Sequence, residues 1–279
     1  MELRDKVAVV TGGASGIGRA TALALAKAGT DVVIADINVE RMNGVVEEVR
    51  GFGRKALPVR CDVTSDEDVD GLARTTLETF GRVDVVHLNA GVSILGPPEK
   101  IPMADWKRLY DLNVFGVVRG LRAFVPILIG QGSGWIVNTS SIAGLVASDY
   151  AQIPYISVKH AITGLTEGLY LYLRPKGVGV SLLCPGRVET NIHEAVRMVG
   201  IDDVRWINLP QPMRRVVPSE DVGEQVVAAI EKERYLIVTH AEQQDWVSDH
   251  GRDVESFLER YLPMLYEGRD AMGMPMPTT

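Results

Sequence analysis

The sequence predicts an α/β protein with a single doubly wound domain, in which helices cover both faces of a mainly parallel sheet. Three observations support this fold class. Short, almost uninterrupted apolar runs are typical of strands that are buried on both sides. These runs alternate with helical segments along residues 1–240, which is the pattern of βαβ units, and right-handed crossovers then place helices on both faces. The length of 279 residues suits one domain.

The expected elements follow one another in regular order. Strands are expected at residues 7–10, 31–35, 56–61, 83–88, 135–138, 179–183 and 236–238. Helices are expected at residues 18–28, 38–52, 66–80, 105–128, 155–173 and 221–230. The helix at 66–80 shows how they are identified, because its apolar residues recur at helical spacing and Ser65 and Asp66 can cap its first turn.

We divide the chain into a catalytic domain, residues 1–240, and a C-terminal helical extension with a tail, residues 241–279. The segment 187–218 is long for a connection, and we expect it to form a substrate lid. In the extension, apolar side chains recur at the spacing of an amphipathic helix, which needs an apolar partner surface: Val254, Phe257, Leu258, Tyr261, Leu262 and Leu265. That surface could be the protein's own substrate cleft or another subunit.

Composition argues against several classes of partner. The formal net charge is -7 and the isoelectric point about 5.3, so we expect no nucleic-acid partner and no anionic membrane. Cys61 and Cys184 look like reduced core thiols, and no metal site is expected. The charged N-terminus shows no signal peptide, and the apolar stretch 114–130 is interrupted by Arg119 and Arg122, so we expect no membrane span and a cytoplasmic location.

A glycine-rich turn follows the first expected strand. Residues 11–18 read TGGASGIG, and Gly12, Gly16 and Gly18 would let the backbone approach a diphosphate at a helix N-terminus, as in Rossmann-like folds. Such a loop alone could be a mere strand-to-helix turn. Asp36, however, ends the next strand, where a carboxylate can bind both ribose hydroxyls and would repel a 2′-phosphate. Ser15 leaves the loop without a basic residue, so the sequence predicts NAD in preference to NADP.

A tyrosine and a lysine lie one helical turn apart in the expected helix 155–173. Tyr155 and Lys159 therefore share a face, and the ammonium would lower the pKa of the phenol. A tyrosine tuned in this way can exchange a proton with an alcohol or a ketone. Ser141 lies just beyond the fifth strand, where open α/β sheets bind their ligands, and could orient the substrate oxygen. A tyrosine and a lysine at this spacing usually form no more than a surface pair. Their functional interpretation therefore depends on Ser141 and on the expected ligand-binding edge of the sheet.

Taken together, these residues resemble the motifs of the short-chain dehydrogenase/reductase family over roughly residues 5–238. The matching positions are, in chain order, Gly12, Ser15, Gly16, Ile17 and Gly18 of the cofactor loop, Asp62 and Val63 beside the adenine, Asn89, Ala90 and Gly91 after strand four, Asn113 in a helix, the trio Ser141, Tyr155 and Lys159, and Pro185, Gly186, Val188 and Thr190 near the nicotinamide. Six motifs in the right order make a specific signal.

The resemblance implies a role for each of four residues. Tyr155 would be the general acid/base, and Lys159 would lower its pKa and hold the nicotinamide ribose. Ser141 would polarise the substrate oxygen, and Asn113 would hold a water that links Lys159 to solvent. The chain departs from the family pattern at His87 and Leu88, before Asn89; we interpret His87 as a core histidine with a local partner.

The predicted function is NAD-dependent interconversion of a secondary alcohol and a ketone. The expected lid is rich in apolar residues, which favours a hydrophobic substrate, although these residues could equally pack the lid onto the body: Ile192, Val196, Met198, Val199, Ile201, Trp206, Ile207, Leu209 and Met213. Ile94, Leu95, Val146 and Ile153 could complete the pocket. The resemblance also implies a homo-oligomer, a dimer or a tetramer, formed through the helices around Val114 and Tyr155, and we expect a tetramer. The alternatives are a catalytically silent nucleotide-binding regulator, and an epimerase or dehydratase on the same scaffold.

Overall fold

The computed structural model describes residues 1–147, 149–191, 196–201 and 213–267. Its centre is a seven-stranded sheet in which every neighbouring pair of strands is parallel. The order is β11-β7-β6-β4-β1-β2-β3, with bounds β1 Val7–Thr11, β2 Asp31–Asp36, β3 Ala56–Arg60, β4 Val85–Leu88, β6 Gly134–Thr139, β7 Val178–Cys184 and β11 Leu236–Val238. The chain winds outward from β1 to β3 and then from β4 to β11, so the direction of winding changes between β1 and β4.

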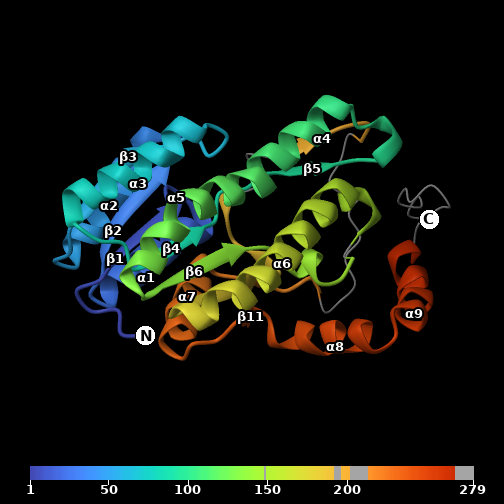
Figure 1. The fold of residues 1–279 in the computed structure, drawn as a ribbon. Helices are drawn as coiled ribbons and strands as arrows, with labels where there is room; N and C mark the ends of the chain where they lie inside the picture. The colour runs from blue at the N-terminus through green and yellow to red at the C-terminus, as the bar shows by residue number, and fades with distance from the viewer. Residues whose placement is uncertain (148, 192–195, 202–212, 268–279) are drawn as a thin grey trace.

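Helices cover both faces of this sheet (Figure 1). One face packs against α1 (Gly16–Lys27), α2 (Val39–Gly51) and α7 (Ser219–Glu231). The other face packs against α3 (Asp66–Phe80), α5 (Gly116–Gln131) and α6 (Ile153–Leu173). Successive side chains of β1 show why both faces must be covered, because Ala8 and Val10 belong to the first core and Val7 and Val9 to the second. The predicted doubly wound fold is confirmed.

The helix ends follow from local sequence. Ser65 accepts a hydrogen bond from the Asp68 backbone N–H at 3.1 Å and so caps α3, as predicted, and three acidic residues occupy its first turn, where the helix dipole favours them. The expected single helix at 105–128 is instead three continuous segments. They are α4 (Met103–Tyr110), a π-helical turn (Asp111–Phe115) and α5. Asn113 lies in the π turn, and such turns occur frequently at functional sites.

By length and composition, the continuous stretch Met103–Gln131 could cross a membrane, with a mean hydropathy of 1.6 in its most apolar window. The prediction that two arginines make this region too polar is therefore wrong by that measure. A helix in the core of a folded domain passes the same test, and Val117, Phe124 and Leu128 are buried against the sheet. Packing on the sheet is thus one reason for the apolar composition.

Short elements at the carboxyl end of the sheet were not expected from the sequence. Two small parallel sheets form there, β5 (Ser93–Leu95) with β9 (Val196–Met198) and β8 (Arg187–Val188) with β10 (Val216–Val217). Single 3-10 turns lie at Pro98–Lys100, Ile142–Gly144, Tyr150–Gln152 and Ala241–Gln243, and a further one, Arg174–Lys176, precedes β7 at the opposite end of the sheet. These two-residue and three-residue pairings are too short to give a periodic sequence pattern.

The C-terminal extension forms α8 (Gln244–Arg252) and α9 (Val254–Tyr266), which follow β11 at the lower right of Figure 1. The predicted amphipathic helix is confirmed. Its buried residues Phe257, Tyr261 and Leu265 pack against Val146, which lies between Ser141 and Tyr155 in the same chain. Its opposite face remains exposed at Val254, Leu258 and Leu262. The apolar partner surface therefore belongs to the chain's own catalytic side.

Candidate active site

The predicted catalytic group lies where β6 ends and α6 begins. Ser141 follows β6, and its hydroxyl accepts a hydrogen bond from the Ala143 backbone N–H at 3.1 Å. The same hydroxyl donates to the Pro185 carbonyl at 3.3 Å and is hydrogen-bonded to the Tyr155 hydroxyl. The fold thus brings Ser141 and Tyr155 into direct contact. Taken as a whole residue, Tyr155 is half-buried.

Lys159 is buried one turn after Tyr155. Its ammonium lies 5.4 Å from the centre of the Tyr155 ring and donates a hydrogen bond to the Thr139 carbonyl at 3.0 Å. Burial lowers the pKa of Lys159 from 10.5 to about 8. The lysine is therefore near enough to act on the phenol, but its own bond is to the end of β6.

The predicted lowering of the Tyr155 pKa is wrong for the protein alone. Burial raises the pKa of Tyr155 to about 12, and the hydrogen bond with Ser141 only partly opposes this effect. Removal of the phenol from water disfavours the charged phenolate, and this effect sets the direction of the shift. In this state Tyr155 is a neutral hydroxyl and hence a proton donor at neutral pH.

Asn113 reaches this group from the π turn. Its amide nitrogen donates to the carbonyls of Leu109 at 3.0 Å and Val92 at 3.2 Å, whereas its buried oxygen Oδ1 has no protein partner. A Cβ atom placed on Gly91 would lie 2.8 Å from this oxygen and 3.6 Å from Nζ of Lys159. Both polar groups therefore face the same small space beside Gly91, and an acceptor oriented in this way could bind a water.

The glycine-rich loop between β1 and α1 has the shape that a diphosphate needs. Gly12 and Gly16 have φ angles of +63° and +50°, which side chains disfavour. A Cβ on Gly12 would come within 3.0 Å of the Ala90 backbone, and one on Gly18 would overlap the carbonyl of Gly12. Ser15 precedes α1 and its hydroxyl makes no capping bond, so it stays available to a ligand.

Asp36 stands at the end of β2, beside the same loop. Its carboxylate accepts hydrogen bonds from the backbone N–H of Ala14 at 3.1 Å and of Asn38 at 2.9 Å. The loop and the carboxylate are therefore fixed relative to each other. Together with the open helix N-terminus, these residues fit a dinucleotide whose diphosphate lies on the loop and whose ribose reaches Asp36.

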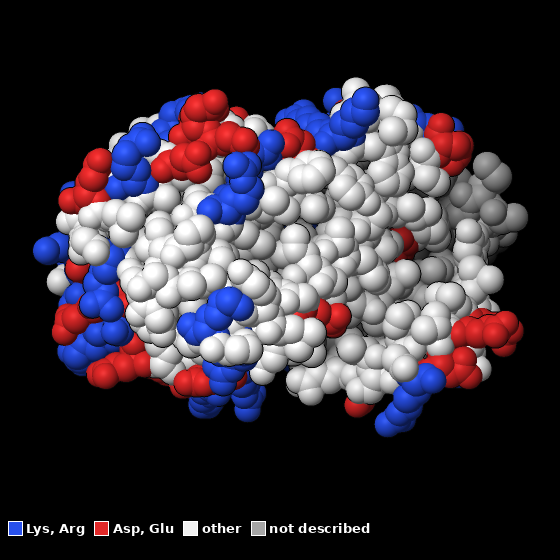
Figure 2. Space-filling view, viewed as in Figure 1, with Lys and Arg blue, Asp and Glu red and all other residues white. Residues whose placement is uncertain are grey.

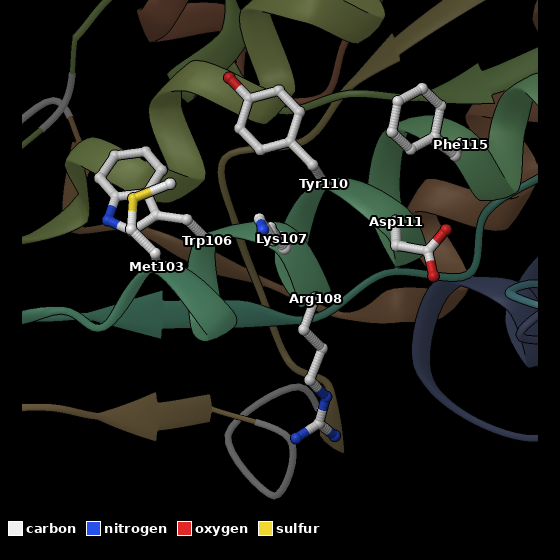
Figure 3. A pocket seen from close by; sticks show the side chains of 7 residues that line it. All are labelled: Met103, Trp106, Lys107, Arg108, Tyr110, Asp111 and Phe115. Atoms are coloured by element: carbon white, nitrogen blue, oxygen red, sulfur yellow. The ribbon is translucent and has the colours of Figure 1, made fainter.

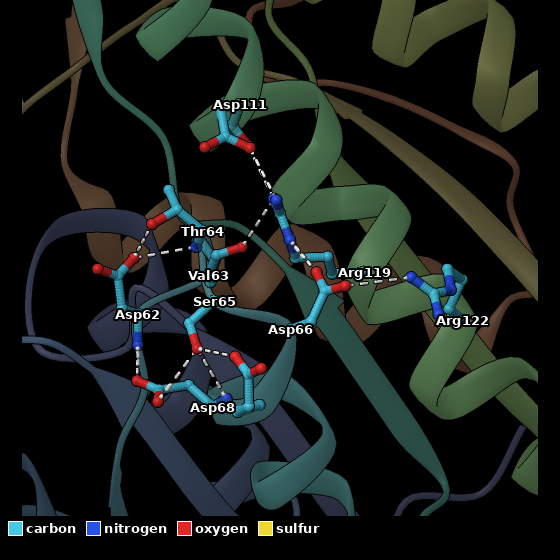
Figure 4. Close-up of polar contacts among 10 residues, drawn as sticks. Asp62, Val63, Thr64, Ser65, Asp66, Asp68, Asp111, Arg119 and Arg122 are labelled. Carbon is cyan, nitrogen blue, oxygen red and sulfur yellow. Dashed lines mark hydrogen bonds and ion pairs between the residues drawn. The ribbon is translucent and has the colours of Figure 1, made fainter.

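The two residues expected beside an adenine belong to a polar network between α3 and α5 (Figure 4). Asp62 accepts hydrogen bonds from the backbone N–H and the hydroxyl of Thr64, which lower the pKa of its carboxyl. Arg119 donates to the carbonyl of Val63 at 3.4 Å and bonds the carboxylates of Asp66 and Asp111 at 2.6 and 2.8 Å. This role of Arg119 could not be predicted from the sequence, where the residue is only a charge within an apolar run.

A second polar chain connects the predicted Asn89 with His87. The His87 ring contacts the hydroxyl of Thr139 at 2.8 Å, and this hydroxyl donates to Oδ1 of Asn89 at 3.2 Å. Asn89 in turn donates to the carbonyls of Thr11 and Gly12 at 3.1 and 3.4 Å. His87 is fully buried, and its pKa is lowered to about 3 by burial. The interpretation of His87 as a core histidine with a local partner is confirmed.

The predicted segment from Pro185 to Thr190 closes the site from the other side. The Pro185 carbonyl accepts hydrogen bonds from Ser141 and, at 2.8 Å, from the Ile142 backbone N–H. Thr190 lies against the glycine-rich loop, since a Cβ on Gly16 would approach its Cβ to 3.1 Å. The six sequence motifs therefore meet at one edge of the sheet.

The residues expected to line a substrate pocket divide into groups. Ile94 packs in one apolar cluster with Val158, Val199 and the Tyr155 ring, whereas Val146 packs against α9. Leu95 is buried and Ile153 is 39% exposed, and Met213 is buried near the end of the expected lid. Ile192, Trp206, Ile207 and Leu209 lie outside the described residues.

Comparisons of the sequence and of the structure with known proteins agree with one another. A sequence model for "short chain dehydrogenase" matches residues 6–198. The chain is 33% identical to a cyclohexanol dehydrogenase of an Acinetobacter species over 220 residues, which cover 77% of this chain and 87% of that protein. A short-chain dehydrogenase/reductase from Burkholderia phymatum, solved in complex with NAD, superimposes with a TM-score of 0.82 and 35% identity, covering 92% of this chain and 96% of the other. A 7α-hydroxysteroid dehydrogenase, solved with NADH and 7-oxo glycochenodeoxycholic acid, gives a TM-score of 0.75 and 29% identity over 86% of this chain and 95% of its own.

Proposed function

The chain belongs to the short-chain dehydrogenase/reductase family of oxidoreductases, and from this premise we propose that it interconverts a secondary alcohol and a ketone with NAD as its coenzyme. The observation that carries the proposal is the direct contact between Ser141 and Tyr155, with the Lys159 ammonium 5.4 Å from the tyrosine ring. A silent nucleotide-binding protein would have no need to keep these three polar groups together in a buried setting. NAD supplies the hydride acceptor and, once reduced, the hydride donor.

The chain's own residues move the proton and hold the substrate oxygen. In ketone reduction, Tyr155 donates its hydroxyl proton to the substrate oxygen, which the high pKa of its free state permits at neutral pH. In alcohol oxidation Tyr155 would first have to lose its own proton, through Lys159 and the water at Asn113, and the Lys159 cation would stabilise the resulting phenolate. That phenolate would then accept the proton of the alcohol hydroxyl. Ser141 exchanges its bond with the Pro185 carbonyl for one with the substrate oxygen. Asn113 and its unpartnered Oδ1 hold a water beside Lys159.

Asp36 supports NAD as the preferred coenzyme. Its carboxylate is fixed beside the glycine-rich loop by two backbone N–H groups. The same oxygens can accept hydrogen bonds from ribose hydroxyls, whereas a 2′-phosphate would bring a second negative charge next to them.

We further propose a hydrophobic, cyclic alcohol as substrate. The apolar cluster around Ile94, Val158 and Val199 includes the Tyr155 ring, so an apolar surface adjoins the proton donor. The cyclohexanol dehydrogenase relative supports this direction, because cyclohexanol is a secondary alcohol on an apolar ring.

A homo-oligomer is also proposed. The face over α5 and α6 carries few charges in its middle, while acidic and basic side chains gather at its rim (Figure 2). Beside it, α4 and the π turn form an open hollow of about 680 Å³, in which Met103, Trp106, Tyr110 and Phe115 are joined by Lys107, Arg108 and Asp111 (Figure 3). Met103 and Phe115 are 68% and 52% exposed, and a second copy could cover them. Light scattering of the purified protein at micromolar concentration tests this, and a monomer would contradict it.

The enzyme proposal is tested by following NADH absorbance with a panel of cyclic and linear secondary alcohols. Turnover of cyclohexanol-like substrates with NAD is expected. Tyr155→Phe should lower kcat about 100-fold or more, since it removes the general acid/base, and should leave NAD binding within a factor of two. An unchanged rate in this variant would remove Tyr155 from the mechanism.

A further inference from the structure

Gly186, in the segment expected to meet the nicotinamide, is enclosed by His240 at the end of the catalytic domain and by Gln243 of the C-terminal extension. A Cβ on Gly186 would lie 2.6 Å from both polar atoms of the Gln243 amide and 2.7 Å from Nδ1 of His240. His240 and Gln243 are almost completely buried. Only a glycine fits at this position, because the residues that follow β11 occupy the space that a side chain would need.

A continuous hydrogen-bond chain starts at the same glycine. The Gly186 backbone N–H donates to the Thr239 hydroxyl at 3.2 Å. That hydroxyl lies 2.7 Å from Nδ1 of His240, and Nε2 of His240 lies 3.2 Å from the carbonyl of Arg215. Three segments far apart in sequence are thus joined through one imidazole ring.

When the His240 imidazole is neutral, only one placement of the protons gives every group in this hydrogen-bond chain a partner. A carbonyl can only accept, so Nε2 of His240 must carry the proton that it donates to Arg215. Nδ1 is then an acceptor, and the Thr239 hydroxyl donates to it while accepting from Gly186. Every donor and acceptor is used, and a chain of this kind fixes the geometry of all its members.

The two ends of the chain belong to one small sheet. Gly186 immediately precedes β8, and Arg215 immediately precedes β10, which pairs with β8. His240 therefore holds together the starts of both strands. The strand β8 leads into Thr190, which lies against the glycine-rich loop at Gly16.

We infer that Thr239 and His240 are positioning residues that fix the Gly186 backbone, and with it the segment that adjoins the coenzyme's reactive ring. This inference rests on the proposed oxidoreductase function. Neither residue touches the catalytic group, so they act through the placement of β8. A displacement of about 1 Å at a reacting centre can cost roughly 100-fold in rate, so a change here should affect kcat more than the binding of the alcohol.

Two conservative substitutions of His240 each remove one of the two hydrogen bonds made by its ring. His240→Asn places an acceptor where Nδ1 lies and keeps the hydrogen bond from the Thr239 hydroxyl, but it removes the hydrogen bond to the Arg215 carbonyl. His240→Gln places a donor where Nε2 lies and keeps the hydrogen bond to the Arg215 carbonyl, but it removes the acceptor for the Thr239 hydroxyl. Thr239→Val preserves shape and removes the acceptor for Gly186. His160→Asn, at an exposed histidine on α6, is the matched control.

We expect His240→Gln and Thr239→Val to lower kcat about tenfold, with KM for the alcohol changed less than twofold. His240→Asn should keep kcat within about threefold of the parent, as the control does. Equal kcat in all three variants and the control would overturn the inference. An equal loss in His240→Asn and His240→Gln would overturn it too, since it would indicate a general packing role.

Amide hydrogen exchange keeps this test independent of turnover. The Gly186 N–H is itself the donor, so its exchange rate reports the bond directly. In peptides covering residues 184–190, exchange should accelerate at least tenfold in Thr239→Val and stay unchanged in His160→Asn, at temperatures where thermal melts show both variants folded. Unchanged exchange in Thr239→Val would overturn the inference even if alcohols are turned over. Absence of any turnover by the parent protein, with accelerated exchange in the variant, would instead refute the proposed function and leave the positioning contact supported.

Discussion

The ammonium of Lys159 donates a hydrogen bond to the backbone carbonyl of Thr139 at 3.0 Å, which anchors a buried cation at the end of the central strand β6. The cation is fixed by the backbone before any coenzyme or substrate is bound. Its position is therefore a property of the fold. Its charge is costly there, as the lowered pKa of about 8 shows.

The first prediction concerns this cost. Between pH 8 and 10.5 the folded protein binds fewer protons at Lys159 than the unfolded chain, so its unfolding free energy rises with pH across that window. Below pH 8 the ammonium destabilises the fold by about 3 kcal/mol. Lys159→Met should therefore be inactive yet about 2 kcal/mol more stable at pH 7, since the cost of about 3 kcal/mol is removed and about 1 kcal/mol is lost with the hydrogen bond to Thr139.

Urea unfolding of the coenzyme-free proteins at pH 7 and pH 9.5 measures this effect. The advantage of Lys159→Met should shrink at the higher pH, where the parent's lysine loses its charge. Lys176→Met, at a partly exposed lysine, is the control and should show no such change. A variant less stable than the parent at pH 7 would contradict the prediction.

The second prediction concerns coenzyme choice. Asp36→Asn removes the negative charge and keeps an acceptor for only one of the N–H groups of Ala14 and Asn38, because these bond different carboxylate oxygens. The affinity for NADP relative to NAD should rise about tenfold, which corresponds to about 1.4 kcal/mol of relieved repulsion. Fluorescence titration with NADH and NADPH measures the ratio, and Asp70→Asn on the exposed side of α3 is the control. If the parent already binds NADPH more tightly, Asp36 does not select the coenzyme.

Much of the fold and the site was predictable because the signals are local. Buried parallel strands are continuously apolar, so all seven were located, and motifs such as Gly12 to Gly18 are contiguous in sequence. Because the carboxyl ends of the strands meet at one edge, placing each motif after its strand also placed the motifs together.

The features that could not be predicted from the sequence are contacts between residues that lie far apart along it. The contact of His240 with Arg215 and the contact of Arg119 with Val63 join segments with no shared pattern. The pKa of Tyr155 was predicted with the wrong sign, because helical spacing reveals the neighbouring Lys159 but not the extent of burial. Burial is a property of the whole fold, and here it is the largest cause of the shift.

The third prediction concerns His87. Its pKa of about 3 means that the unfolded chain binds more protons than the folded protein between pH 3 and 6.5, so stability is lost as the pH falls through that window. The loss from this one group reaches about 5 kcal/mol at most. His87→Leu removes the titrating ring and its unpartnered Nδ1, and it should be within about 1 kcal/mol of the parent at pH 7.

At pH 4.5 the His87→Leu protein should be more stable than the parent by about 2–3 kcal/mol. Thermal and urea unfolding at both pH values test this difference. His160→Gln, at an exposed histidine, should keep the same offset from the parent at both pH values. Parallel loss of stability in His87→Leu and the parent on acidification would show that His87 is not a source of acid sensitivity.

The last prediction uses two arginines of α5 that share one partner. Arg119 and Arg122 both bond Asp66, at 2.6 and 3.5 Å, but their side chains are 18% and 69% exposed. Only Arg119 also reaches the Val63 carbonyl and Asp111 (Figure 4). Arg119→Ala should therefore lower the unfolding free energy by about 1–2 kcal/mol, while Arg122→Ala should change it by less than about 0.5 kcal/mol.

The same pair tests whether the network shapes the adenine side of the proposed coenzyme site. Because Arg119 fixes the backbone of Val63, its loss should weaken NADH binding roughly three- to tenfold, and kcat at saturating NAD should remain within about twofold. Arg122→Ala should alter neither quantity. Nicotinamide mononucleotide, which lacks the adenosine half, should bind the parent and Arg119→Ala equally. A loss of mononucleotide affinity as large as the loss for NADH would place the effect elsewhere in the site and contradict this role of Arg119.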